Sequence, residues 1–342
     1  MRVKAFALLV LVAASVTALR ALPAIADSVD VKIDEWMTPS KPAYPHDPAV
    51  APDGSIWYTA QRASTIGRFD PATEQFKEFA LPTPSSGPHG LQADKDGNIW
   101  YTGNAAGLIG KVDPKTGKVT EYKMPNPKAR DPHTIAFLQD GRLFFTVQAG
   151  NFIGTLDPKA PNGAIKLVES PTVNSRPYGV RLTSKGVPFF DEFNSNKIAS
   201  ADPKTLVITE YPLPNKDARP RRIAIGKDDT VWYGDYARGY LGRFDPATGQ
   251  VREWPSPGGP QSQPYGITTT GGVIWYSESG VRPNTLVRFD PRTEAFQTWV
   301  IPSGGGVVRN MMATADGNLV MACSGVNRVA LVEVKNSATS RR

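Results

Sequence analysis

The sequence predicts an all-β protein, a seven-bladed β-propeller built from four-stranded blades. Three observations predict it: an aromatic strand motif that recurs seven times, an Asp-Pro turn motif that recurs six times, and no helical hydrophobic stripe after the N-terminal segment. Four-stranded units repeated every ~40–50 residues are typical of propellers, in which the blades surround a central channel.

The first motif is a strand that follows Asp-Gly or a related turn and contains a pair of aromatic residues, as in DGSIWYTA and DGRLFFTV. Successive copies are 43 to 45 residues apart and place the following residues in register: Trp57, Trp100, Phe144, Phe189, Trp232, Trp275 and Val320. Large aromatic side chains at equivalent strand positions are expected to pack between neighbouring blades.

The second motif is Asp-Pro, as in FDPATG and VDPKTG, and it recurs with a similar period at Asp70, Asp113, Asp157, Asp202, Asp245 and Asp290. It favours a type I turn, because proline fixes φ and the carboxylate can accept a backbone hydrogen bond. Each turn separates an apolar strand such as TIGRF from an alternating strand such as QFKEFAL. Together with the aromatic strand and a strand that begins at Pro-His or its equivalent, each repeat has four strands.

The two ends of the repeat region complement each other. Residues 31–38, VKIDEWMT, resemble a fourth strand, whereas the last repeat stops after its third strand, NRVALVEV. The N-terminal strand is therefore predicted to join the C-terminal blade and close the ring, which removes an exposed sheet edge. A β-solenoid is the alternative, although its coils are usually shorter. We place one propeller domain at residues 27–335 and a polar tail at residues 336–342.

Residues 1–26 have the pattern of a secretory signal peptide, with a basic start, a short apolar run and small residues before Asp27. We therefore expect an exported protein, periplasmic or secreted, with no membrane span after cleavage because the apolar run is short. Removing this segment lowers the formal charge from +7 to +4 and leaves no lysine and arginine run, so nucleic acid is not an expected partner. The single cysteine, Cys323, excludes an intramolecular disulfide and is expected to be a buried thiol. A monomer is expected.

The innermost strand of each blade is predicted to place one residue at the same mouth of the channel: His46, His89, His133, Tyr178, Arg221, Tyr265 and Arg309. All three histidines of the chain lie in this ring, on consecutive blades and each after a proline. Asp131 precedes His133 by two residues. A histidine near its ordinary pKa of about 6.5 can exchange a proton at neutral pH, and a carboxylate can orient it or hold a divalent metal.

The segments PHGL/PYGI, DGNIWYT, IGRFDP and TEYxLP, which cover residues 31–334, resemble the streptogramin B lyases, also called virginiamycin B lyases, a family of seven-bladed propellers. The resemblance implies an activity that opens a cyclic depsipeptide antibiotic at its ester bond by elimination, with help from magnesium. It also implies a functional histidine at the Pro-His position of one blade and a Glu-Pro-His triplet in the next, in the last two blades. Here those positions hold Tyr265, Val307 and Arg309.

The family's order of histidine, carboxylate and histidine occurs here on different blades. Asp131 and His133 form Asp-Pro-His on blade three, and His89 lies on blade two. These three are the candidate catalytic residues, with His46 assisting. Two alternatives remain. Three imidazoles and Asp131 could bind a transition metal with an open position, or Pro-His recurs only as a structural part of the repeat at the channel rim. The metal ligands are not determined by the sequence.

A second group of polar residues is expected near the same mouth. Three residues after the aromatic marker, blades four to six carry Glu192, Asp235 and Glu278. With the ring residues Tyr178, Arg221, Tyr265 and Arg309, they are candidate ligands for a polar small molecule or peptide. The alternative is that these acids form ion pairs that hold neighbouring blades in register.

Two classes of function remain after the motif search. The chain has no G-x-x-x-x-G-K loop and no G-x-S-x-G elbow, so neither a nucleotide or organic cofactor nor a simple serine hydrolase is supported. One class is an exported carbon–oxygen lyase assisted by a divalent metal such as magnesium. The other is a non-catalytic propeller that binds a small molecule, peptide or protein at the channel mouth, because propellers host many functions.

Overall fold

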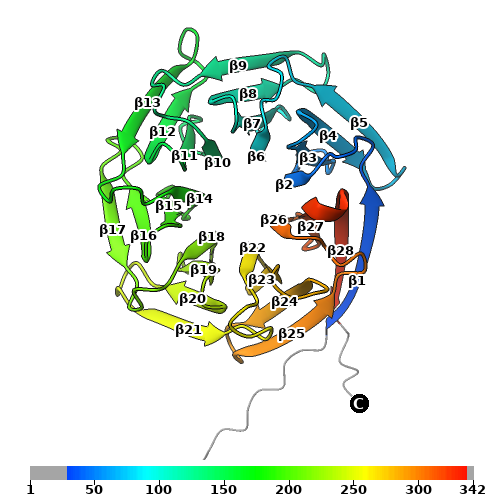
Figure 1. Ribbon diagram of the computed structural model, residues 1–342, viewed down its shortest axis with the longest axis vertical. Coiled ribbons are helices and arrows are strands. Elements are labelled where there is room, and N and C mark those ends of the chain that lie inside the picture. The colour runs from blue at the N-terminus through cyan, green and yellow to red at the C-terminus, as the bar shows by residue number, and fades with distance from the viewer. Residues whose placement is uncertain (1–28, 337–342) are drawn as a thin grey trace, which may run out of the picture.

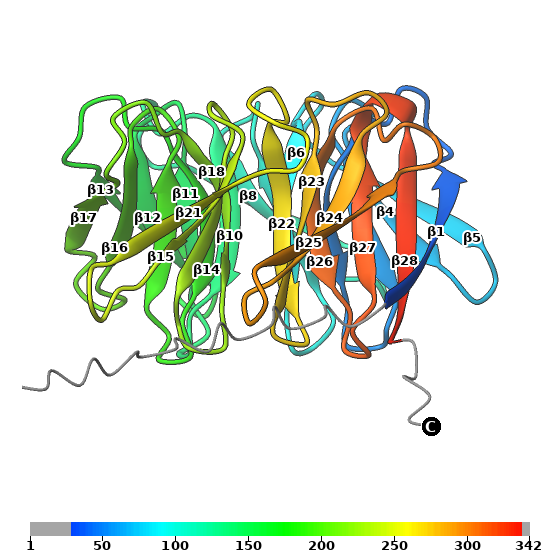
Figure 2. The same cartoon turned by 90° about the horizontal axis from the view of Figure 1, so that it is seen from below.

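Seven four-stranded antiparallel sheets surround a channel in the computed structural model, which describes residues 29–336 (Figure 1). The expected signal peptide at residues 1–26 and the tail beyond Asn336 lie outside the described residues. Figure 2 shows the inner strands running steeply between the two faces of the disc, while the outer strands are tilted. The predicted fold class is confirmed.

The strands occupy equivalent positions in every blade. The innermost strands are β2 (Pro45–Val50), β6 (Pro88–Ala93), β10 (Pro132–Phe137), β14 (Pro177–Leu182), β18 (Pro220–Ile225), β22 (Pro264–Thr270) and β26 (Val308–Ala313). The second strands carry the aromatic motif: β3 (Ile56–Ala60), β7 (Ile99–Gly103), β11 (Leu143–Val147), β15 (Pro188–Glu192), β19 (Val231–Asp235), β23 (Val273–Glu278) and β27 (Leu319–Cys323).

The two outer positions complete each sheet. The third strands are β4 (Thr65–Asp70), β8 (Leu108–Val112), β12 (Phe152–Asp157), β16 (Lys197–Ala201), β20 (Tyr240–Phe244), β24 (Thr285–Asp290) and β28 (Arg328–Asn336). The fourth strands are β5 (Gln75–Ala80), β9 (Val119–Lys123), β13 (Ala164–Glu169), β17 (Ile208–Pro212), β21 (Val251–Pro255), β25 (Ala295–Val300) and β1 (Val29–Met37). A short 3₁₀ turn, η1 (Ser324–Val326), links β27 to β28.

The ring closes by the pairing that the sequence predicts. Strand β1 pairs antiparallel with β28, in a register that sets Val29 opposite Asn336 and Met37 opposite Arg328. Blade seven is therefore built from both ends of the described chain, and β1 covers the sheet edge that β28 would otherwise expose. No helix within residues 29–336 has the length and apolar composition needed to cross a bilayer.

The repeated aromatic pair packs on both sides of its blade, as predicted. Trp57 belongs to an apolar cluster shared with blade two, whereas Tyr58 belongs to one shared with blade seven. Neighbouring residues of a strand point to opposite faces, and each face of a blade is covered by the next blade. Both side chains are therefore fully buried.

The glycine of the IGRF strand is required by the tyrosine of the aromatic strand. A Cβ atom at Gly67 would lie 2.0 Å from Cζ of Tyr58. The Tyr58 hydroxyl donates to Oε1 of Glu78 on the outer strand at 3.0 Å. Tyrosine, glycine and glutamate repeat this arrangement in two other blades, as Tyr101, Gly110 and Glu121 and as Tyr233, Gly242 and Glu253. The motif thus joins three strands of one blade.

Candidate functional site

The second residue of each innermost strand lies at one mouth of the channel, and a break in strand register follows it in every blade. Three imidazoles and one phenol ring are in contact along this ring, with neighbouring ring planes tilted by 41–49°. The ring centroids are 3.6 Å apart for His46 and His89, 3.8 Å for His89 and His133, and 3.7 Å for His133 and Tyr178. The structure thus brings all three predicted histidines into contact.

A mouth cavity of about 310 Å³ opens above this ring. Its lining includes most of the candidate residues chosen from the sequence: His46, His89, Asp131, His133, Tyr178, Arg221 and Arg309. Five lining residues were not predicted, and all of them come from loops: Tyr44, Gln61, Arg62, Asn104 and Gln148. Tyr265 lies just behind the lining, with its hydroxyl 2.5 Å from that of Tyr178.

The three imidazoles are buried and are held neutral at pH 7. Burial lowers the pKa of His46, His89 and His133 well below the ordinary value, and the arginines near them lower it further. Nδ1 of His46 donates to Oδ1 of Asp47 at 2.9 Å, and Nδ1 of His133 lies 3.0 Å from the Thr134 hydroxyl. Nδ1 of His89 has no hydrogen-bond partner among the described residues. A neutral imidazole has one donor and one acceptor nitrogen, so His46 and His133 each have only Nε2 left for a ligand.

Asp131 differs from the imidazoles, because its charge titrates near neutral pH. Burial raises the pKa of its carboxyl group to about 7, against the opposing effects of the Ala149 N–H and of Arg176. Nδ2 of Asn104 donates to Oδ1 of Asp131, and the backbone of Asp131 has a φ of 69°. No hydrogen bond joins Asp131 to the ring imidazoles in the part of the chain that the structure describes. Asp131 and the histidines therefore share a cavity without forming a hydrogen-bonded chain.

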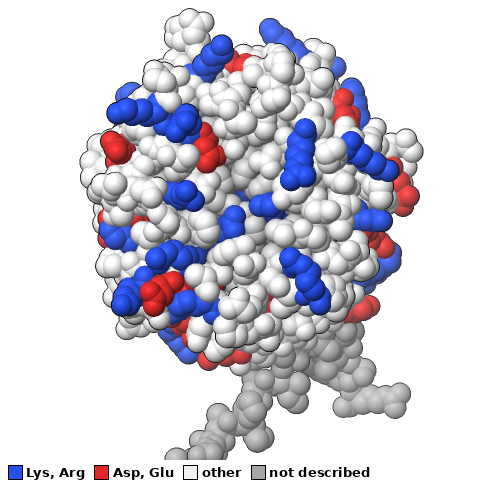
Figure 3. Space-filling model, viewed as in Figure 1, with Lys and Arg blue, Asp and Glu red and all other residues white. Residues whose placement is uncertain are grey.

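The other side of the mouth is cationic. The Arg221 guanidinium lies 3.9 Å from the ring centroid of Tyr265 and donates from Nε to the Tyr178 hydroxyl at 3.3 Å. Arg309 donates to the hydroxyl of Tyr44. Although burial opposes ionisation of Tyr265, the nearby arginines lower its pKa below the ordinary value. Lysine and arginine side chains gather around the central hollow of this face (Figure 3).

The channel is closed beneath the ring by residues that sequence reasoning missed. Arg222 of blade five reaches Asp47 of blade one, with Nη2 2.6 Å from Oδ1 and Nη1 3.2 Å from Oδ2. Its Nη1 also contacts the Thr134 hydroxyl of blade three, and Asn310 of blade seven donates to Asp47 at 3.0 Å. A ligand of the mouth cavity therefore does not pass through the channel.

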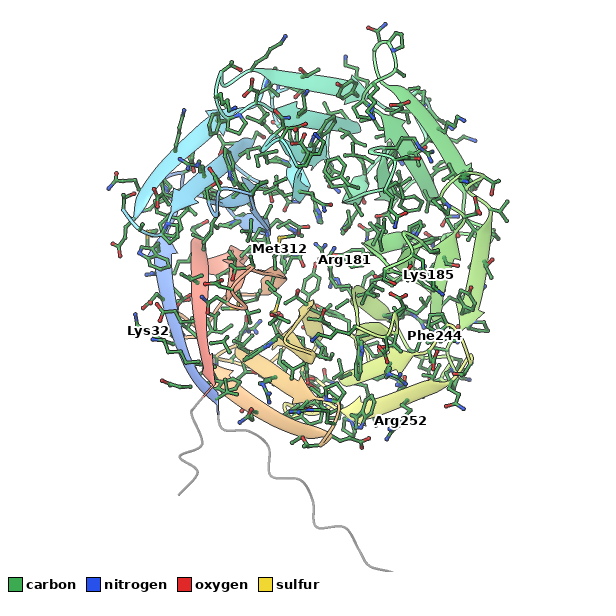
Figure 4. All side chains as sticks on the ribbon, turned by 180° about the vertical axis from the view of Figure 1, so that it is seen from behind. Lys32, Arg181, Lys185, Phe244, Arg252 and Met312 are labelled. Atoms are coloured by element: carbon green, nitrogen blue, oxygen red, sulfur yellow. The ribbon has the colours of Figure 1, made fainter. Side chains whose placement is uncertain are left out.

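A second, smaller cavity lies below this closure. It measures about 190 Å³ and includes Asp47, Thr134 and Asn310 in its lining, together with Arg181 and Met312. Figure 4 shows Arg181 and Met312 near the channel as seen from the opposite face. The closure by Arg222 thus separates two cavities of different composition.

The residues that form the closure follow the ring residues directly. In blades two, four and six this position is the glycine of PHGL, PYGV and PYGI, whereas in the other four blades it is Asp47, Thr134, Arg222 and Asn310. This departure from glycine is visible in the sequence and could have indicated the residues that close the channel. Simple strand alternation would turn these side chains away from the channel, but the bulge that follows the ring residue turns them inward.

The acids of blades four to six hold loops instead of lining the cavity. Glu192 accepts from the Ser170 hydroxyl at 2.6 Å, and Asp235 accepts from Nε of Arg238 at 2.7 Å. Glu278 accepts from the Ser256 and Thr285 hydroxyls, both at 2.6 Å. These contacts are structural, but they are not the ion pairs between neighbouring blades that were considered: Glu192 and Glu278 accept from hydroxyl groups, and Asp235 pairs with Arg238 of its own blade.

The family resemblance implies magnesium, and one group of side chains could be considered for it. Ligand atoms of His46, Asp47 and His89 lie within 4.8 Å of one another. However, both oxygens of Asp47 already accept hydrogen bonds from Arg222, and the other two groups are imidazoles. Magnesium prefers oxygen ligands in octahedral geometry. With a guanidinium in contact with its single carboxylate, this donor set does not fit a resident magnesium ion.

The positions of the family's functional triplet are also unsuited to metal chemistry here. Val307 has an apolar side chain, and its backbone N–H donates to Oδ1 of Asn284 at 2.8 Å. Tyr265 and Arg309 occupy the two histidine positions. The histidine and carboxylate chemistry that the resemblance implies at these positions is therefore absent from Tyr265, Val307 and Arg309.

Comparison with known proteins places this architecture in a specific group. The virginiamycin B lyase family matches residues 24–187 and 189–341. A solved streptogramin B lyase structure is similar with a TM-score of 0.81 and 27% identity, covering 89% of this chain and 98% of that one. A catalytically inactive histidine-to-alanine variant of virginiamycin B lyase from Staphylococcus aureus, solved with quinupristin, is similar with a TM-score of 0.79 and 25% identity, covering 89% and 99%.

A curated relative adds a shorter match. Virginiamycin B lyase of Nocardia farcinica is 32% identical over 71 residues, which are 21% of this chain and 25% of that relative. The chain thus matches about a quarter of the length of this curated protein. The likeness over the full propeller comes from the family match and the solved structures.

Proposed function

The chain belongs to the virginiamycin B lyase family, and from that membership we propose that it is an exported carbon–oxygen lyase that acts in the mouth cavity. Its substrate would be a cyclic depsipeptide or a related small molecule with an ester bond. The solved relative with quinupristin supports a small molecule as the ligand class. A cavity of about 310 Å³ is of the size that binds part of such a molecule.

The observation that carries this proposal is the pairing of one proton acceptor with unpaired cations in a single cavity. Asp131 has a carboxyl group with a pKa of about 7, which suits a general base at neutral pH. Arg221 and Arg309 line the same cavity. Elimination next to a carbonyl group needs both: a base to take the proton and positive charge to stabilise the oxygen on which negative charge develops.

The elimination requires neither water nor an external reactant. The carboxylate of Asp131 takes the proton from the carbon next to the carbonyl group, and the electrons of that C–H bond form a C=C bond. The bond between the neighbouring carbon and the ester oxygen breaks, and the ester leaves as a carboxylate. An arginine can neutralise both the developing enolate oxygen and the departing carboxylate.

The imidazoles would bind and orient the substrate. His46 donates from Nδ1 to Asp47, so its Nε2 is an acceptor in the neutral ring. Nδ1 of His89 is without a partner, and it can form a hydrogen bond if a substrate group displaces the packing around it. His133 lies in contact between His89 and Tyr178, so its ring is held in place on both sides.

Export is supported by the sequence of residues 1–26, which has the basic, apolar and small-residue regions of a signal peptide. Expression of the full chain in a Gram-negative host, followed by fractionation and N-terminal sequencing, tests this part. The expected result is mature protein outside the cytoplasm that begins at Asp27. Full-length protein retained in the cytoplasm would contradict it.

Mass spectrometry of the reaction product tests the activity. Purified protein is incubated with quinupristin and with a panel of lactones and esters. Elimination gives a ring-opened product of unchanged mass with a new C=C bond, whereas hydrolysis adds one water. Asp131→Asn is expected to lower turnover by about 10²–10⁴-fold. Asp140→Asn, a change at an exposed turn of the same blade, is the matched control.

Non-catalytic binding in the same cavity is the second candidate. It is favoured because Tyr265, Val307 and Arg309 stand where the family has a histidine, a glutamate and a second histidine. Absence of turnover across the panel, with and without added divalent metals, would overturn the lyase and support binding alone. Undiminished turnover in Asp131→Asn would overturn the assignment of the base.

A further inference from the structure

Three arginines line the mouth cavity, and none forms an ion pair with a carboxylate of the described residues. Arg62 lies over the Tyr44 ring at 4.2 Å, and Arg309 lies over the same ring at 4.9 Å. Arg221 lies on blade five, across the ring of innermost strands from Arg62. The phenol ring of Tyr265, on blade six, lies between blades five and seven. Arg62 is exposed, whereas Arg221 and Arg309 are partly buried. An arginine that is withdrawn from solvent usually has an acidic partner.

The cavity has too few acids to balance these cations. Asp131 is the one carboxylate in its lining, and burial raises the pKa of that group to about 7. The remaining lining residues are imidazoles, phenols and amides, which are neutral at pH 7. The nearest other acid, Asp47, is paired with Arg222 below the ring. The mouth therefore carries excess positive charge.

The structure of the Arg221 site holds its guanidinium in place without neutralising it. Four aromatic rings surround it, with centroids 3.9 to 5.2 Å from Cζ: Tyr178, Phe193, Tyr236 and Tyr265. Aromatic faces stabilise a cation by about 0.5–2 kcal/mol, but they leave its charge and most of its N–H donors available. A fixed guanidinium loses little freedom when a planar anion binds.

Arg309 has donors to spare as well. It donates to the Tyr44 hydroxyl, whereas its buried Nε has no hydrogen-bond partner among residues 29–336. A buried donor without a partner is costly and is usually satisfied by a ligand or water. Arg221 on blade five and Arg309 on blade seven thus form an arginine pair on either side of Tyr265.

We propose that this arginine pair binds a carboxylate group of a small-molecule ligand, without any divalent metal ion. Guanidinium groups match carboxylates in geometry and charge, and the hydrogen bonds between them are strong where water is excluded. In the proposed lyase, which this step of the inference presupposes, the bound carboxylate is the leaving group of the eliminated ester. The binding itself does not depend on turnover.

Isothermal titration of the full-length protein tests the inference. The probes are acetate, succinate, citrate and inorganic phosphate, each at constant ionic strength in buffer freed of divalent metals by a chelating resin, with acetamide and succinamide as neutral counterparts. We expect the carboxylates to bind and the amides not to bind. Arg309→Gln is expected to weaken carboxylate binding by at least about tenfold, the loss of one charge-assisted hydrogen bond. Arg309→Lys should retain part of the affinity.

Two further variants make the result specific. Arg221→Gln is expected to weaken binding as Arg309→Gln does, and circular dichroism reports whether it folds; Arg309→Gln carries the test if it does not. Arg68→Gln, the same change at a partly exposed side chain of β4 outside the cavity, is the matched control and should bind as the unaltered protein does.

Several results would overturn the inference. They are equal affinity for carboxylates and their amides, unchanged binding in Arg309→Gln, binding that appears only with added magnesium, and phosphate binding tighter than every carboxylate. Carboxylate binding without turnover would remove the proposed lyase activity and keep this site. Turnover with unchanged binding in Arg309→Gln would do the reverse.

Discussion

Arg222 and Asp47 form a buried ion pair that crosses the channel from blade five to blade one, with 2.6 Å between Nη2 and Oδ1. Both side chains are almost fully buried, at 1% and 2% exposure. The pair ties blades that are not neighbours, and it forms the floor of the mouth cavity. Asp47 in turn holds Nδ1 of His46, so one carboxylate links the closure of the channel to the orientation of the first imidazole.

Removing one member of this pair should destabilise the propeller strongly. Asp47→Asn leaves Arg222 buried without a counter-charge, which costs about 3–5 kcal/mol in the free energy of unfolding. Urea unfolding followed by tryptophan fluorescence measures it. The double variant with Arg222→Met should lose less than the sum of the two single changes, and additive losses would contradict a direct interaction.

A matched surface pair provides the control for that experiment. Arg142 and Asp140 are 2.7 Å apart, but Asp140 is 53% exposed. Asp140→Asn should therefore cost at most about 1 kcal/mol, because solvent screens the exposed carboxylate. A similar loss for the buried and the exposed pair would show that burial of the Arg222 pair is not the cause.

The pH dependence of turnover should report Asp131. Its carboxyl group accepts a proton only when ionised, so kcat/KM is expected to rise with pH and to level off above a midpoint of about 7. The imidazoles do not produce this limb, because their pKa values lie well below 6.5. Asp131→Asn should abolish the limb and Asp140→Asn should preserve it. Because asparagine also tolerates positive φ, the backbone at residue 131 should be retained. A midpoint unchanged in Asp131→Asn would identify another group as the base.

Removal of divalent metals should leave the activity intact. The donor set at His46, Asp47 and His89 does not fit magnesium, and guanidinium groups supply positive charge at the mouth. Dialysis against EDTA, followed by turnover assays with and without added magnesium, tests this. Loss of activity on chelation and its recovery with magnesium would contradict the arginine-based site.

The fold could be predicted because its information is local and repeated. The spacing of the aromatic strands set the number of blades, and the unpaired β1 motif predicted closure with β28. The ring of innermost-strand residues followed from symmetry alone. In each case the sequence carries the same signal several times, so that one degenerate copy, such as Val320 in place of an aromatic residue, did not obscure it.

The chemistry of the site was less predictable, because it depends on residues that break the repeat. His46, His89 and His133 were expected to exchange protons near neutral pH, but burial and the nearby arginines lower their pKa values. Their contact could not be read from spacing. Arg222 and Asp47 were not chosen as site residues, because a bulge reverses the direction that strand alternation assigns to them.

Hydroxyl groups link neighbouring blades at the level of the ring. The Thr102 hydroxyl of blade two accepts from the Gly90 N–H at 2.7 Å and donates to the His133 carbonyl of blade three at 2.8 Å. The same double role recurs at Thr59, Thr146 and Ser277. A hydroxyl suits this position because it accepts one hydrogen bond and donates another.

Blade four has Asp191 at this position, and that change should make stability depend on pH. Oδ1 accepts from the Gly179 N–H at 3.0 Å, whereas the buried Oδ2 has no partner in the described part of the chain. Burial raises the pKa of Asp191 to about 8, against the opposing effects of the Gly179 N–H and of Arg222. The unfolded chain has a pKa near 3.9 for this residue type. Between these two values the folded protein holds a proton that the unfolded chain has released.

Stability should therefore fall as pH rises through this window, by up to about 1.4 kcal/mol per pH unit from Asp191 alone. Asp191→Thr restores the hydroxyl used in the other blades and removes the titration. Urea unfolding of both proteins from pH 5 to pH 8 tests the prediction, and taking the difference between them cancels the contributions of Asp131 and the histidines. The stability advantage of Asp191→Thr over the unaltered protein should grow steadily toward pH 8. The reason is that the folded unaltered protein keeps the carboxyl proton, which the unfolded chain has released, until the pH approaches the folded-state pKa. A difference that is constant across the range would show that Asp191 does not carry a proton in the folded protein.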